Sequence, residues 1–128
     1  MTERNTRQKT AVATVLAEAR TPLTPRDIQV RARTIVATIS QATVYRILKG
    51  LLEKQDVTTV QLPGEPPLYE QAGKTHHHFF RCRRCKQMYE VQGCDNLIDR
   101  LVPKGFTLED HDVFLFGLCR TCTGEQSA

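Results

Sequence analysis

Two pairs of cysteines in the second half of the chain constrain its fold more than any other feature. Cys82 and Cys85 form one CxxC pair, Cys119 and Cys122 form another, and 33 residues (86–118) separate them. The two-residue spacing lets both sulfurs of a pair face one ion, and two pairs supply four thiolates for tetrahedral zinc. Four protein ligands leave no open coordination position. The pattern therefore predicts a structural zinc rather than a hydrolytic one.

The alternatives for these cysteines depend on the compartment. Residues 1–5 are polar and lack the apolar stretch of a secretory signal, and no apolar run approaches the roughly 20 residues of a membrane span. We therefore expect a cytoplasmic protein with no membrane partner, in which thiols stay reduced and disulfides are disfavoured. A thioredoxin-like redox centre would need only one pair. The fifth cysteine, Cys94, is either a core residue or a soft ligand of a second metal.

The first half of the chain has the periodicity of three helices followed by a hairpin. Apolar residues at i, i+3, i+4 and i+7 predict a first helix that begins near Arg7. Thr24, Pro25 and Asp27 form a capping-box sequence that begins a second helix, with Ile28, Ala32 and Ile35 on its buried side. Ser40 can cap a third helix. Predicted strands over 57–62 and 68–70 flank a turn rich in proline and glycine, which completes a winged helix-turn-helix.

The third predicted helix carries polar, basic and aromatic side chains away from its apolar stripe. Such side chains can bond to base edges, cover thymine methyls and contact phosphates, although an ordinary exposed helix has a similar composition. Residues 1–60 carry 10 Lys/Arg against 5 Asp/Glu, whereas residues 61–128 carry 8 against 9. A solvated basic surface would give the same count, but the basic half is the candidate for phosphate contacts. The predicted DNA contacts are Lys9, Gln41, Thr43, Tyr45, Arg46 and Lys49.

A second concentration of metal ligands precedes the first cysteine pair. In a strand, His76 and His78 would point to one side and His77 to the other, so the triplet can supply two sites. A histidine-rich surface loop without a metal is the alternative. The neighbouring cysteine framework favours the binding of a second divalent ion, and imidazole and carboxylate ligands can accept Zn²⁺, Mn²⁺ or Fe²⁺. The candidate ligands are Glu70, His76, His77, His78, Glu90, Cys94, Asp99 and His111.

The segment between the cysteine pairs predicts a small α/β unit. Tyr89 and Val91 indicate a strand, apolar residues within 97–102 form a helix face, and residues 113–116 indicate a later strand. An exposed strand or helix of this unit could form a two-fold interface. The predicted fold class is therefore α+β, with a winged-helix DNA-binding domain over 1–72 and a dimerisation and metal-binding domain over 73–128.

Several of these stretches together resemble the ferric uptake regulator family over nearly the whole chain. They are residues 39–48, 68–70, 76–85, 105–106 and 117–122, together with His111. The resemblance implies a winged helix, an α/β dimerisation domain, a tetracysteine zinc and regulatory metal sites near the hinge. It also implies a dimer that represses metal-uptake or stress genes when loaded with metal.

The resemblance also implies roles for particular residues. Tyr45 and Arg46 match the family's recognition-helix contacts, and Glu70, His76, His77 and His111 match its regulatory positions. The chain departs from the family at Phe79, where a histidine usually precedes the first cysteine by three residues. It departs again at Pro22, near a usual hinge histidine. One regulatory site must therefore be lost or rebuilt from other ligands.

These observations favour a metal-dependent repressor that binds palindromic double-stranded operator DNA as a homodimer. Zinc is the favoured ion, because it binds such ligands more tightly than manganese or iron and because the segment 90–94 resembles zinc-sensing branches of the family. A manganese or iron regulator is the runner-up. We expect no enzymatic activity, because no HExxH motif is present. A zinc hydrolase, a thiol oxidoreductase and a metal chaperone are the remaining alternatives, and a chaperone would need neither Tyr45 nor Arg46.

Overall fold

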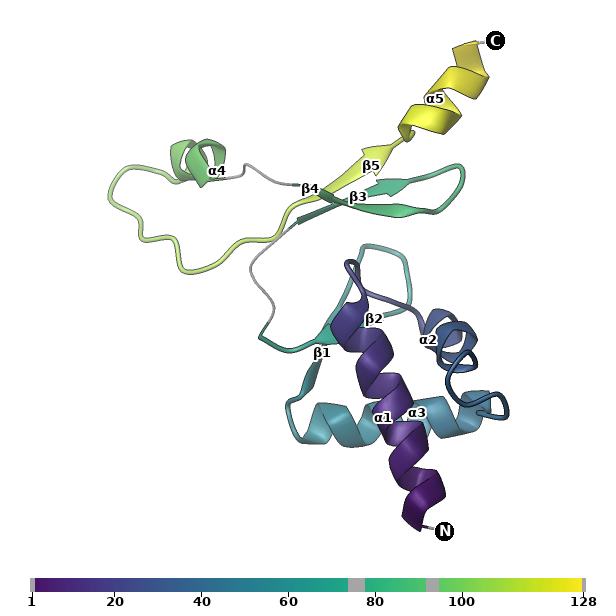
Figure 1. Ribbon diagram of the computed structural model, residues 1–128. Coiled ribbons are helices and arrows are strands. Elements are labelled where there is room, and N and C mark those ends of the chain that lie inside the picture. The colour runs from purple at the N-terminus through teal and green to yellow at the C-terminus, as the bar shows by residue number, and fades with distance from the viewer. Residues whose placement is uncertain (1, 74–77, 92–94, 128) are drawn as a thin grey trace. The chain divides into compact units, whose positions relative to one another are not determined.

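The computed structural model describes residues 2–73, 78–91 and 95–127 and divides the chain into two compact units. The first unit is Met1–Lys74 and the second is Thr75–Ala128. Helices and strands occur in both units (Figure 1), which confirms the predicted α+β class. Among the described residues, no helix has the length and apolar character that crossing a membrane requires.

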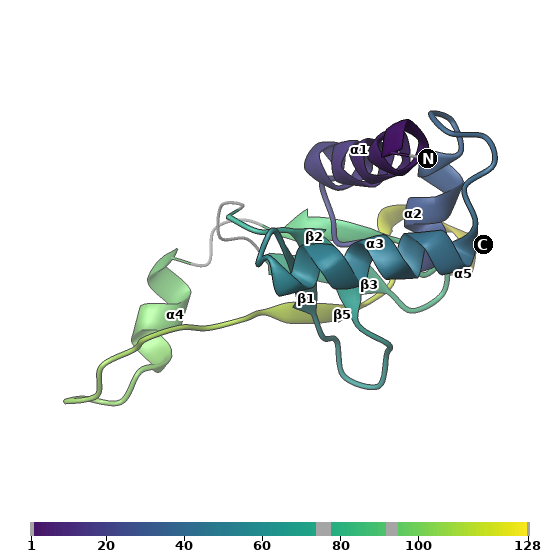
Figure 2. The same cartoon turned by 90° about the horizontal axis from the view of Figure 1, so that it is seen from below.

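The first unit consists of three helices and a two-stranded hairpin (Figures 1 and 2). Its elements are α1 (Thr2–Glu18), α2 (Pro25–Ala32), α3 (Gln41–Glu53), β1 (Val57–Val60) and β2 (Leu68–Gln71). The strands are antiparallel, with Val57 opposite Gln71 and Val60 opposite Leu68. This is the order of elements expected of a winged helix.

Details of the first unit differ from the sequence prediction. Helix α1 begins at Thr2 rather than near Arg7, because its first turns are polar and exposed and give no apolar periodicity. The first strand ends at Val60 rather than at residue 62. Ile35 is 47% exposed instead of buried, because α2 ends at Ala32 and the chain turns away from the helical register.

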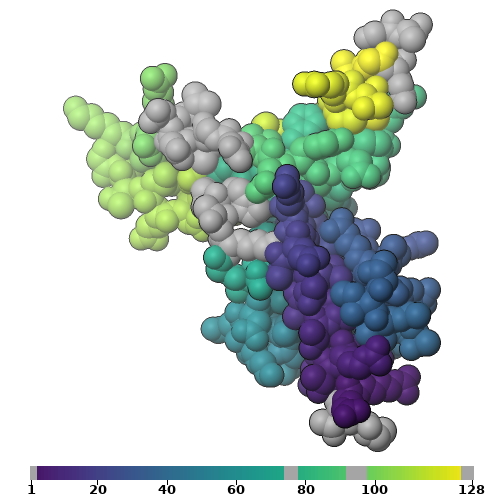
Figure 3. Space-filling model, viewed as in Figure 1, coloured from purple at the N-terminus to yellow at the C-terminus, as the bar shows by residue number. Residues whose placement is uncertain are grey.

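The predicted apolar stripes form the core of the first unit. Val12, Leu16 and Ile28 are fully or almost fully buried, as are Val44 and Leu48 on α3. One face of α1 is therefore held against the core, while its other side lies on the surface of the unit (Figure 3). Burial of these apolar side chains is the main contribution to the free energy that stabilises the packing of the three helices.

Side-chain hydrogen bonds fix where α2 and α3 begin. Thr24 Oγ1 accepts a bond of 3.0 Å from the Asp27 N–H, and Asp27 Oδ2 accepts one of 3.3 Å from the Thr24 N–H. This is the predicted capping box. The Ser40 hydroxyl accepts from the Thr43 N–H at 3.1 Å, which confirms the cap of α3. The Ile39 carbonyl accepts from Gln29 Nε2, so the segment that leads into α3 is held by α2.

The second unit is a three-stranded sheet with two helices. Its elements are β3 (His78–Cys82), β4 (Met88–Val91), α4 (Asp95–Leu101), β5 (Phe114–Gly117) and α5 (Arg120–Ser127). The strand order is β4-β3-β5. Strand β3 is antiparallel to β4 and parallel to β5, with Phe79 opposite both Glu90 and Phe114. Helix α5 was not predicted, because its residues carry no apolar stripe.

The capping box gives the first test. Replacing Thr24 with alanine removes the acceptor for the Asp27 N–H, so we expect the free energy of unfolding to fall by about 1 kcal/mol. Urea denaturation followed by circular dichroism measures this change. Thr38→Ala is the matched control, because Thr38 is exposed and caps no helix. Equal stabilities of the two variants would show that the box contributes nothing.

Candidate metal centre and nucleic-acid interface

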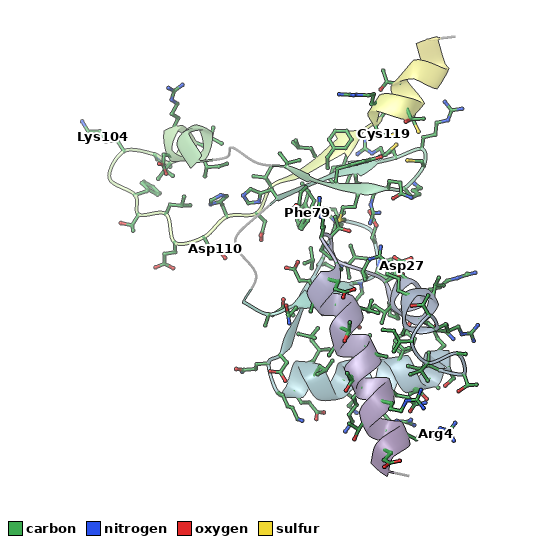
Figure 4. All side chains as sticks on the ribbon, in the orientation of Figure 1. Arg4, Asp27, Phe79, Lys104, Asp110 and Cys119 are labelled. Atoms are coloured by element: carbon green, nitrogen blue, oxygen red, sulfur yellow. The ribbon has the colours of Figure 1, made fainter. Side chains whose placement is uncertain are left out.

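The four paired cysteines converge at one end of the sheet in the second unit. Cys82 ends β3 opposite Gly117 at the end of β5, and Cys119 follows β5 two residues later. Sulfur atoms gather beside Cys119 in Figure 4. The four Sγ atoms all lie within 4.8 Å of one another, and Cys85 Sγ is 3.8 Å from Cys119 Sγ. A tetrahedron with metal–sulfur bonds of about 2.3 Å has edges of about 3.8 Å, so the site fits a zinc-sized ion.

Backbone geometry at the first pair explains how a short turn presents two sulfurs. The Lys86 N–H donates to the Cys82 carbonyl at 3.0 Å, and the Cys82 N–H donates to Gln87 at 3.0 Å. Lys86 has a φ of 67°, which is unusual for a residue with a Cβ and which tightens the turn. The Cys85 N–H then donates to Cys82 Sγ at 3.4 Å. The turn thus points backbone dipoles at the sulfur.

The thiols differ in how easily they lose protons. The Cys85 N–H and neighbouring backbone groups lower the pKa of Cys82 to about 5. The N–H of Cys122 lowers the pKa of Cys119, whereas burial raises the pKa of Cys122 to about 12. A metal needs thiolates, so an ion entering this site displaces the proton of Cys122 while Cys82 is already prepared as a ligand.

Tyr89 on β4 lies beside the cysteine cluster, although the sequence pattern predicted only a strand at this position. Its hydroxyl forms a hydrogen bond with the sulfur of Cys119, which lowers the pKa of Cys119 and raises that of Tyr89. Hydrogen bonds to a ligating sulfur orient the ligand and tune the metal. No sequence signal marked this residue, because the contact arises from the pairing of β4 with β3 and not from a motif.

The predicted regulatory ligands are distributed over both units. Glu70 lies half-buried in β2 of the first unit, Glu90 and Asp99 are exposed in β4 and α4, and His111 is half-buried before β5. His76, His77 and Cys94 lie outside the described residues. Among those described, only the four cysteines form a set of three or more His, Cys, Asp or Glu ligands close enough to share an ion.

His78 and His111 are the two regulatory candidates that the structure places side by side. Their ring centroids are 4.8 Å apart. His78 is buried, and its Nδ1 accepts a hydrogen bond of 3.0 Å from the Val113 N–H. The neutral ring then carries its proton on Nε2. A metal on Nε2 would require that proton to move, so His78 serves in this conformation to join β3 to the segment before β5.

The predicted DNA contacts lie mainly on the exposed side of α3. Tyr45 is 52% exposed, and Arg46 and Lys49 are also exposed, whereas Gln41 and Thr43 are half-buried. Arg46 Nη2 donates to Thr43 Oγ1 at 3.3 Å. Lys9 is exposed on α1. The buried stripe of α3 anchors the helix, and the opposite side presents an aromatic ring and cations to solvent.

Residues 1–116 match the sequence model of the ferric uptake regulator family. This chain belongs to the ferric uptake regulator family. A ferric uptake regulation protein of Campylobacter jejuni is 29% identical over 95% of this chain and 81% of the relative. The ferric uptake regulator of Helicobacter pylori, whose structure has three functional metal sites, is 28% identical with a TM-score of 0.74. That likeness covers 91% of this chain and 79% of the other.

A third similar protein is FurB of M. tuberculosis, a zinc uptake regulator whose structure matches with 26% sequence identity and a TM-score of 0.53. It covers 94% of this chain and 95% of the other. The resemblance inferred from the sequence is therefore confirmed. Ferric uptake regulators are metal-sensing, DNA-binding, dimeric transcription regulators and not enzymes. Within the described residues of this regulator, the four cysteines are a group that could hold a metal ion.

Removal of the Tyr89 hydroxyl tests its role beside Cys119. We expect Tyr89→Phe to weaken the cysteine site roughly 10- to 100-fold for Zn²⁺, the probe ion, because a ligating sulfur loses its hydrogen bond. Competition with a chromophoric chelator measures the affinity. Tyr45→Phe is the matched control, because Tyr45 lies in the first unit. An affinity for Tyr89→Phe equal to that of the control would contradict the assignment.

Proposed function

We propose that this regulator is a metal-dependent transcriptional repressor that binds palindromic operator DNA as a homodimer and senses zinc. The proposal rests on one observation: this member of the family combines an exposed polar face on α3 with a cluster of four cysteines in a separate unit. We assign residues 1–72 to DNA binding and residues 73–128 to dimerisation and metal binding. The paired cysteines hold a structural zinc in this proposal.

Exposed apolar side chains in the second unit support the dimer. Leu101 is 76% exposed, Phe106 is 69% exposed, and Leu108 and Leu115 are 41% and 44% exposed. Apolar groups this exposed on a small unit are typical of protein–protein interfaces. A dimer would remove them from water and would present two copies of α3 to the two halves of a palindrome.

The regulatory ion is proposed to join the two units. Glu70 belongs to the wing, whereas His76, His77 and His111 belong to the second unit. An ion bound by ligands from both units restricts their arrangement, and only one spacing of the two α3 helices fits both operator half-sites. Binding free energy at the metal is thereby coupled to binding free energy at DNA.

Two arguments favour zinc as the sensed ion. Imidazole and carboxylate ligands bind zinc more tightly than manganese or iron, and Cys94 offers a soft ligand. FurB of M. tuberculosis, a zinc uptake regulator, matches over most of this chain. An iron regulator is the alternative that the C. jejuni and H. pylori relatives favour, and a manganese regulator uses the same kinds of ligand.

Base recognition by α3 is tested with Tyr45. We expect Tyr45→Ala to weaken binding to the operator by roughly 1 to 3 kcal/mol and binding to random DNA much less, because an aromatic ring can cover thymine methyls in the major groove. Fluorescence anisotropy at fixed salt and metal measures both affinities. Tyr45→Phe keeps the ring and should bind as the parent does. Equal losses on both DNAs would remove Tyr45 from base recognition.

The regulatory site is tested with His77. We expect His77→Ala to abolish the metal response of operator binding while it leaves the zinc content of the cysteine site, the dimer and the melting curve nearly unchanged. Gel shifts over a range of free Zn²⁺ measure the response. Asp112→Ala is the matched control, because this exposed carboxylate lies outside the predicted ligand set. A normal metal response by His77→Ala would place the sensor elsewhere.

A further inference from the structure

A groove runs between α1 and α3 on the first unit. Its volume is about 410 Å³, and its polar and glycine lining consists of Asn5, Gln8, Lys9, Arg46, Gly50 and Lys54, with Thr43 at one side. Helices α1 and α3 cross and contact one another in this unit (Figure 1). Arg46 lines the groove and lies three residues before the exposed Lys49 on α3, so the groove adjoins the exposed side of that helix.

All the charged side chains that line the groove are positive. Lys9, Arg46 and Lys54 line it, and no Asp or Glu does. Arg46 donates to the Thr43 hydroxyl, and among the described residues none of the three cations forms an ion pair. Three cations that share one groove without a carboxylate repel one another, and an anion in the groove would relieve that repulsion.

Gln8 adds an unpaired hydrogen-bonding group to the groove. Its side chain is 5% exposed and lines the groove from α1. Among the described residues no side-chain hydrogen bond of Gln8 is found. Its amide is not one of the fully buried polar groups, so it is open to the groove, where an incoming group can bond to it. The groove is the direction from which such a partner can approach.

Gly50 is unusual because it lies inside helix α3. Glycine destabilises a helix relative to alanine, and it is retained where close approach or an unusual backbone angle requires it. Neither reason applies within the chain: Gly50 has no positive φ, and a Cβ at this position would meet nothing within 4 Å. The open space beside Gly50 is the groove itself. The glycine therefore points to a group from outside the chain that approaches the α3 backbone.

We propose that this groove receives a backbone phosphate of the operator, an inference that rests on the proposed function. Lys9, Arg46 and Lys54 supply charge, and Gln8 Nε2 donates a hydrogen bond to a phosphate oxygen. The missing Cβ at Gly50 lets the strand lie close to α3 while Tyr45 faces the bases. Arg46 is then a phosphate contact that fixes register, and not a base contact. A free phosphate compound has the same chemistry, but the adjoining exposed side of α3 favours DNA.

Gly50→Ala separates this role from a structural one. The added methyl has room in the protein and improves helix propensity, so the melting temperature should stay equal or rise. Binding of the metal-loaded dimer to operator and to random DNA should fall by the same factor, on the order of tenfold, because a charge-assisted contact is displaced. Gly124→Ala is the matched control, because Gly124 also lies in a helix with open space around its Cα.

Lys54→Gln tests the charge. Each phosphate neutralised by the protein contributes about 0.9 to the slope of log affinity against log salt, so this variant should lose about that much per subunit. Lys104→Gln, which removes an exposed lysine of the second unit (Figure 4), should leave the slope unchanged. Parental affinity and slope in both Gly50→Ala and Lys54→Gln would overturn the groove proposal and leave the proposed function intact.

A third measurement separates DNA from a free phosphate compound. Pyrophosphate is titrated into the metal-loaded parent and both variants without DNA, with the Gly50 amide followed by NMR in the parent. Weak or no binding of pyrophosphate, combined with the DNA losses above, supports the operator phosphate. Tight pyrophosphate binding that the variants lose while they keep parental DNA affinity would overturn it. Failure of the metal-loaded parent to bind its operator at all would overturn both proposals.

Discussion

Convergence of four sulfurs is the constraint on which the second unit depends. Among its described residues, the buried apolar side chains are Phe79 and the cysteines Cys82, Cys119 and Cys122. A unit this small has too little apolar area to offset the entropy of ordering its chain, and bound metal commonly supplies the difference. The first unit has a continuous core of aliphatic side chains drawn from all three helices. One unit is therefore held by hydrophobic burial, and we infer that the other is held largely by metal coordination.

The 33-residue interval between the cysteine pairs follows from this topology. Strands β3 and β5 are parallel, and parallel neighbours need a crossover connection that a tight turn cannot provide. The chain uses β4, α4 and the segment 102–113 for that connection. Parallel pairing then brings the last residues of β3 and β5 to the same end of the sheet. Both cysteine pairs lie at that end. Short-range CxxC geometry and long-range strand pairing are thus both required before one ion can bind.

Much of the first unit could be predicted from the sequence, because its signals are local. Capping residues at Thr24 and Ser40 and the apolar stripe of α3 act within a few residues of the chain, and the structure confirms them. The cysteine pairs could be predicted for the same reason. Tyr89 and the contact between His78 and His111 could not, because strand pairing brings these residues together from distant positions. The beginning of α1 and the helix α5 have too little apolar pattern to be predicted from the sequence.

The residues that break local rules gather where the chain is proposed to meet other molecules. Gly50 weakens helix α3, Tyr45 exposes an aromatic ring on the same helix, and Gln8 on α1 turns its amide toward the groove between the two helices. Leu101 and Phe106 expose apolar surface in the second unit. Each feature lowers the stability or solubility of an isolated chain, and each is neutralised if a partner covers it. The two units expose different chemistry. The cations and the amide of the first unit suit a polyanion, whereas the exposed aliphatic and aromatic groups of the second unit suit another protein surface. Their segregation into separate units allows DNA contact and self-association to be altered independently.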